Sequence, residues 1–81
     1  MAFSKEEMSA CLRELRARKR VTQQEVADAV GVDATSIYNY ENGRTAPTFE
    51  IAWRLADFFD VSLDRLGGRN TDEAAYGWGK R

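Results

Sequence analysis

The sequence predicts an all-α fold, a compact five-helix domain, from helix start signals, helix stop signals and the spacing of apolar residues. Thr22 forms a capping box with Glu25, and Asp33 is a second good N-cap, so a helix is expected to begin after each of these caps. Gly31 and Gly43 can adopt the left-handed conformation that ends a helix. The link between the two helices is therefore very short, which predicts a sharp crossing.

Before this pair of helices, the sequence predicts a first helix that begins at the N-cap Ser4 and ends at about Lys19. Glu7 is expected to complete a capping box with Ser4. The apolar residues recur at spacings of three and four, which predicts one buried stripe made of Met8, Cys11, Leu12 and Leu15. Cys11 is the single cysteine, so it cannot form an internal disulfide, and it is interpreted as a small buried hydrophobe.

The two central helices are expected to bury one face each and to leave a neutral polar face outside. The predicted core positions are Val26, Ala27, Val30, Ile37 and Tyr40. The outward positions of the second helix carry short, neutral side chains that can form hydrogen bonds: Ala34, Thr35, Ser36, Tyr38, Asn39 and Asn42. Such a face fits the major groove of DNA, where these groups can meet base edges. The alternative is a polar face that contacts only water.

After a loop that ends at Pro47, Thr48 is expected to cap a fourth helix, from Phe49 to about Phe59. Ser62 is expected to cap a short fifth helix that ends near Leu66. The predicted core stripe of the fourth helix is Phe49, Ala52, Leu55, Ala56 and Phe59. Ile51, Trp53 and Phe58 lie off this stripe, so they either widen the core or mark an interface.

Charge is distributed unevenly along a chain whose net charge is only −1. Residues 13–20 carry five positive charges and one negative, whereas residues 50–65 carry four acids and two bases. The basic segment suits a surface that faces phosphates, because salt screening confines its field to about 8 Å. The alternative is a solvated helix end that is favoured by the helix dipole.

Composition excludes several other classes of protein. The chain has 81 residues, of which 43% are hydrophobic and 31% charged, which is typical of one small soluble domain. Its first twenty residues are rich in charge, so neither a signal peptide nor a membrane span is expected, and we predict a cytoplasmic protein. It has no histidine, no evident pair of carboxylates and no phosphate-binding glycine loop, so we expect no enzyme, no metal and no cofactor.

Four segments carry a resemblance to a known family: LRELRARK, VTQQEVADAVGV, TSIYNYENGRTAP and LADFFDVSLDRL. Through them, residues 12–66 resemble the helix-turn-helix family of phage repressors, Cro proteins and their bacterial relatives (lambda-repressor-like, XRE-type). The resemblance implies a DNA-binding domain over residues 1–66, with residues 67–81 as a tail. It also implies a sequence-specific transcriptional regulator, a repressor, that binds a palindromic operator as a homodimer through its third helix.

Site residues follow from the resemblance. It implies that Arg16 pairs with Glu41 to hold the third helix in place. Ala34 offers only a methyl group where relatives often have a long polar residue, so part of the specificity is expected from DNA shape. The residues expected to contact bases are Ala34, Thr35, Ser36, Asn39 and Tyr38, with Asn39 best suited to adenine. The residues expected to contact phosphates are Gln23, Asn42, Arg44, Thr22, Lys19 and Arg20.

Protein partners are less defined by the sequence. A twofold dimer would set two recognition helices about 34 Å apart, one turn of B-DNA. The candidates for its interface are Ile51, Trp53, Phe58, Leu63 and Trp78, and the tail is expected to be flexible or packed there. The alternative function is a protein-interaction module on the same scaffold, either an antirepressor or an antitoxin that holds a toxin.

Overall fold

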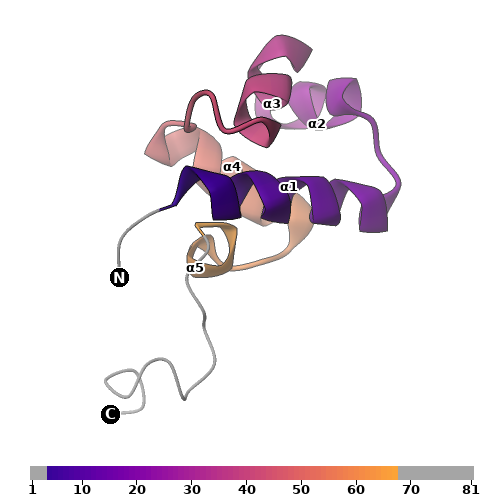
Figure 1. Cartoon of the computed structure of the whole chain (residues 1–81). Helices are drawn as coiled ribbons and strands as arrows, with labels where there is room; N and C mark the ends of the chain where they lie inside the picture. Colours follow the sequence, from indigo (N-terminus) through magenta and orange to yellow (C-terminus); the bar gives the residue numbers. More distant parts are fainter. Residues whose placement is uncertain (1–3, 68–81) are drawn as a thin grey trace.

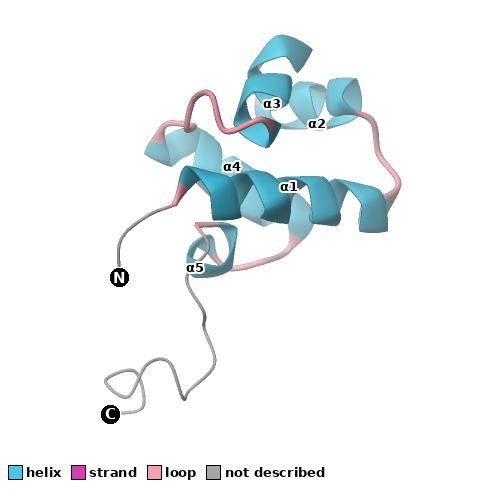
Figure 2. Cartoon of the chain, in the orientation of Figure 1, coloured by secondary structure: helices cyan, strands magenta, loops and turns pink. Residues whose placement is uncertain are grey.

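The computed structural model describes residues 4–67, which form five helices joined by short loops and contain no strand (Figure 2). Figure 1 shows α2 and α3 side by side at one end of the molecule, α1 crossing next to α4 in the middle, and α5 at the opposite end. The predicted all-α, five-helix fold is therefore confirmed. The helices are α1 (Lys5–Lys19), α2 (Gln23–Val30), α3 (Ala34–Glu41), α4 (Phe49–Phe59) and α5 (Leu63–Leu66).

Each helix begins directly after the residue that the sequence marked as its cap. In every case the side chain of the cap accepts a hydrogen bond from the backbone N–H three residues later, and the caps are Ser4, Thr22, Asp33, Thr48 and Ser62. At Thr22 the box is reciprocal, because the backbone N–H of Thr22 also donates to Glu25 Oε1 at 2.8 Å. These local bonds satisfy backbone donors that a helix start leaves without a partner, so they fix the boundaries.

One hydrophobic core joins all five helices. Cys11 lies at its edge, half-buried, and burial raises the pKa of its thiol, which suits the predicted role as a small hydrophobe. Gly31 has a φ of +85° at the end of α2, and Gly43 has a φ of +71° after α3, as predicted. The buried apolar side chains are Met8, Leu12, Leu15, Val26, Ala27, Val30, Ile37, Tyr40, Leu55, Ala56 and Leu66.

The prediction for α4 was wrong at Phe49. The apolar spacing predicts Phe49 in the core stripe, but the residue is 71% exposed, and its ring lies 6.0 Å from that of Trp53, which is 54% exposed. Phe49 is the first residue of α4, where the helix reaches the rim of the core. Conversely, Ile51 and Phe58 are partly buried against the core, and Phe58 packs edge-on against Phe59 at 4.9 Å. These two residues therefore widen the core.

Candidate nucleic-acid interface

The outward surface of α3 is neutral and polar. Ile37 and Tyr40 anchor the helix in the core, whereas Thr35 is exposed and Tyr38 is 47% exposed. Ala34, Ser36 and Asn39 are half-buried along the same surface. The helix contains one charged residue, Glu41, which is only 3% exposed and whose carboxylate binds Arg16 of α1. A duplex that approached α3 would thus meet uncharged hydrogen-bonding groups.

These side chains differ in how far they are already engaged. Ser36 Oγ donates to Asp33 Oδ1 at 2.9 Å, and Asn42 Nδ2 donates to Tyr38 O at 2.7 Å. Within residues 4–67, no hydrogen bond occupies the side chain of Thr35 or the amide of Asn39. Thr35 and Asn39 are therefore the residues of α3 whose polar atoms are most available to a base edge.

The predicted pair of Arg16 and Glu41 is present and holds α3 against α1. Arg16 Nε donates to Glu41 Oε2 at 2.7 Å, and Arg16 Nη2 donates to Glu41 Oε1 at 3.1 Å. The hydrogen bond to Glu41 raises the pKa of Arg16, so the guanidinium stays charged. A third donor joins the pair, because Gln23 Nε2 lies 3.1 Å from Glu41 Oε1. In the free protein the Gln23 amide therefore binds Glu41, whereas the resemblance implies that Gln23 contacts a phosphate.

Three polar contacts between helices were missed by the sequence reasoning. Ser9 Oγ lies 2.6 Å from Tyr40 O, and the guanidinium of Arg13 donates to Glu41 O, so α1 binds the last carbonyls of α3. Arg54 Nη1 of α4 donates to Val30 O of α2 at 3.2 Å. The sequence signal available was the spacing of Ser9, Arg13 and Arg16, which puts three polar groups on one face of α1.

The basic segment 13–20 is divided between cations that bind α3 and cations that do not. Arg13 and Arg16 bind α3, as described above, and Arg18 lies 3.6 Å from Glu14 of the same helix. The ammonium of Lys19 lies 5.1 Å from the centre of the Phe58 ring, a cation–π contact with α4. Arg20 is exposed after α1. The segment thus forms less of a free basic surface than its composition suggested.

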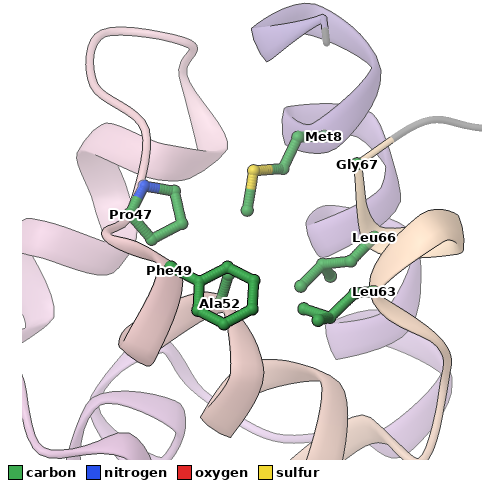
Figure 3. Close-up of a pocket in the computed structure, with 7 residues that line it drawn as sticks. All are labelled: Met8, Pro47, Phe49, Ala52, Leu63, Leu66 and Gly67. Atoms are coloured by element: carbon green, nitrogen blue, oxygen red, sulfur yellow. The ribbon is translucent and has the colours of Figure 1, made fainter. Parts of the chain in front are cut away.

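A concave surface lies between α1, α4 and α5 and contains no residue of α2 or α3 (Figure 3). Its volume is about 240 Å³, and Phe49 and Leu63 reach into it from α4 and α5. The residues that line it are Met8, Pro47, Phe49, Ala52, Leu63, Leu66 and Gly67. It is an apolar pocket, separate from the polar face of α3. Among the proposed dimer residues, Leu63 lines it, and Trp78 lies outside the described residues.

The cap of α3 makes this helix sensitive to acid. Donation from the backbone N–H and the hydroxyl of Ser36 lowers the pKa of Asp33 below its ordinary value of 3.8. The cap therefore stabilises the folded protein fully above pH 3.8, and this contribution is lost as pH falls through the lower folded-state pKa. We expect wild type to be more stable than Asp33→Asn at pH 6, because Asn still caps but carries no charge. Urea denaturation should show this difference shrinking below pH 3.8; a constant difference would contradict it.

The fold and the short crossing of α2 and α3 define the class of protein as a helix-turn-helix domain. A helix-turn-helix family model matches residues 12–66, more than half of the chain. The chain therefore belongs to the helix-turn-helix family, as the resemblance indicated.

Two curated relatives and one solved structure illustrate the match. The transcriptional repressor RstR of the cryptic phage CTXphi in Vibrio cholerae is 43% identical over 53 residues, 64% of this chain and 47% of that protein. The regulator AnsR of Bacillus subtilis is 40% identical over 58 residues, 72% of this chain and 50% of that protein. The chain thus spans about half the length of both relatives.

The structural match extends over most of the chain. The P22 c2 repressor, whose crystal structure is a complex with synthetic operator 9T, superposes with a TM-score of 0.72. The two chains are 27% identical, and the match covers 73% of this chain and 89% of the other. No helix in the part of the chain that the structure describes is long and apolar enough to cross a membrane.

Proposed function

We propose that this protein is a sequence-specific DNA-binding transcriptional regulator, a repressor, that inserts α3 into the major groove. The observation that carries the proposal is the neutral polar face of α3, on which the side chains of Thr35 and Asn39 have no hydrogen-bond partner within residues 4–67. RstR and the P22 c2 protein, both similar to this chain, are repressors by name, and the second is bound to an operator. The relatives named above are regulators by name, in agreement with the expectation that the chain is not an enzyme.

Thr35 and Asn39 make the main contacts to bases, and Tyr38 lies at the edge of the groove. Ala34 supplies a methyl group, and Ser36 must share its hydroxyl with Asp33. Phosphates on the two sides of the groove are held by α2 and by the loop after α3. On the first side of the groove the phosphate contacts come from Thr22, Gln23 and Arg20, and on the second side from Asn42 and Arg44. Lys19 contacts a phosphate after giving up its cation–π contact with Phe58. This role requires access to DNA, which agrees with the cytoplasmic location expected from the sequence.

A homodimer on a palindromic operator completes the proposal. Trp53 and Phe49 give α4 an exposed aromatic pair, and the apolar pocket beside Phe49 extends that surface to α5. This surface supports the predicted interface at Trp53 and Leu63, whereas Ile51 and Phe58 contribute less because the core covers part of each. The same surface favours the alternative function, a module that holds a protein such as a toxin.

Selection from a random duplex library, followed by mobility-shift titration across a salt series, tests the proposed function. A DNA reader should enrich one sequence and bind it with a steep dependence on salt. A module that only docks a protein should enrich none. Binding should need no added metal or cofactor, and sedimentation of the complex should give two chains per duplex.

Arg44→Ala is expected to weaken binding to the enriched and to a scrambled duplex alike. Arg44 is exposed in the loop after α3, and no hydrogen bond within residues 4–67 holds its guanidinium. Loss of one phosphate contact should lower the slope of log K against log salt by about 0.9. Arg65→Ala is the control, because Arg65 lies on α5, 3.7 Å from Glu14, at the opposite end from α3 (Figure 1). A loss confined to the enriched duplex would count against a phosphate contact.

A further inference from the structure

The C-terminal end of α3 is capped partly by the backbone that follows it and partly by a different helix. The last turn of α3 carries no basic residue, although cations there stabilise the free carbonyls and the helix dipole. The missing donors come from α1. Ser9 Oγ lies 2.6 Å from Tyr40 O and 2.8 Å from Lys5 O of its own helix, so its one proton has the shorter contact across to α3, and the guanidinium of Arg13 donates to Glu41 O. These contacts fix the position at which the end of α3 meets α1.

The capping residues form one line along α1. Ser9, Arg13 and Arg16 are spaced by four and three residues, so they project from one face of the helix. The first two bind main-chain carbonyls of α3, whereas Arg16 binds the side chain of Glu41 and also donates to Val21 O, before α2, at 3.1 Å. Ser9 is only 4% exposed, so its hydroxyl is enclosed between α1 and α3. The start of α3, in contrast, is capped by its own neighbour Asp33.

We propose that Ser9 and Arg13 are positioning residues that set the angle of α3, and that the discrimination between DNA sequences depends on them. The inference rests on the proposed function, because it concerns how α3 is presented to DNA. Neither residue needs to touch a base. Hydrogen bonds weaken steeply when donor and acceptor lose alignment, so a small rotation of α3 would move the Asn39 amide away from its base edge.

The test compares three variants on the duplex that wild type enriches and on a scrambled duplex, well below the melting temperature. Arg13→Ala is expected to reduce the ratio of the two affinities about tenfold, and Ser9→Ala about threefold, in line with a charged and a neutral hydrogen bond. Arg18→Ala is the matched control. It removes another arginine of α1, 67% exposed at its side chain and paired within residues 4–67 only with Glu14, and should leave the ratio unchanged.

Ser9→Ala separates positioning from a direct contact. Ser9 is buried and uncharged, so its loss cannot remove a phosphate contact. The fold should tolerate this change, since Tyr40 O also accepts from the backbone N–H of Gly43 at 3.3 Å. If Arg13→Ala weakens both duplexes equally and lowers the salt slope, while Ser9→Ala has no effect, Arg13 is a phosphate contact and the proposal is wrong. Variants that lose thermal stability but keep the wild-type ratio would also overturn it.

Residual dipolar couplings of the free protein test the same proposal without DNA. The backbone N–H couplings of α3 relative to those of α1 report the angle between the two helices. This angle should change in Arg13→Ala and in Ser9→Ala but not in Arg18→Ala. Unchanged couplings would overturn the positioning role, even if wild type enriched no sequence. Absence of enrichment alone would instead refute the proposed function.

Discussion

Replacing Arg16 by Met is expected to destabilise the domain by about 3 kcal/mol, because Glu41 would remain buried with most of its partners removed. The Glu41 side chain is 4% exposed and that of Arg16 is 28% exposed, so we place the loss at the lower end of the range for buried pairs. Domains of this size are stable by only about 4–12 kcal/mol. The variant should therefore melt at a clearly lower temperature.

A double-mutant cycle by urea denaturation measures this effect. Arg16→Met combined with Glu41→Met should lose less than the sum of the two single changes, because two apolar side chains leave no unpaired charge. Arg18→Met is the control, as it breaks an exposed pair that contributes about 0–1 kcal/mol. If the losses of unfolding free energy from the two single changes simply added up, Arg16 and Glu41 would have no interaction free energy with each other, which would contradict the prediction.

Asn39→Ala is expected to relax the sequence preference of DNA binding by about 1–3 kcal/mol, or roughly 5–150-fold. The amide of Asn39 is free within the described residues, and it can offer a donor and an acceptor to adenine at once. Thr35→Ala should act in the same direction but more weakly, since alanine keeps a methyl group for thymine. Competition between the enriched and the scrambled duplex measures the ratio.

Gln24→Ala is the matched control for Asn39. Gln24 is an exposed amide on α2 whose Nε2 donates to Asp28 Oδ1 at 2.8 Å, outside the reading face. Its loss should leave the preference intact. If Asn39→Ala weakened both duplexes to the same extent, Asn39 would be a backbone contact and the assignment of base reading to it would be wrong.

Local features were predicted well because their causes lie within a few residues. The capping box of Thr22 with Glu25 and the cap at Asp33 require only contacts three residues apart, so the sequence located both helix starts. The same holds for the turn at Gly31. The pair of Arg16 and Glu41 spans 25 residues, and it was expected only because of the family resemblance.

Features that depend on the crossing of helices were not predictable from spacing. Arg13 contacts Glu41 O because α1 passes the C-terminal end of α3. No periodicity in either helix predicts the angle at which the two helices cross. Phe49 fits the apolar stripe of α4, yet it extends past the helices that would cover it. For the same reason, the number of cations in residues 13–20 overstated the free basic surface, since two of them face α3.

The central claim is that the exposed face of α3 is the surface that receives DNA. An NMR titration of the isotope-labelled wild type with the enriched duplex tests it directly, through the side-chain amide of Asn39 and the backbone amides of all helices. We predict the largest shift changes at Thr35, Tyr38 and Asn39, and small ones at Trp53 and Leu63 once the dimer has formed. Changes concentrated on α4 and α5, with α3 unaffected, would contradict the account.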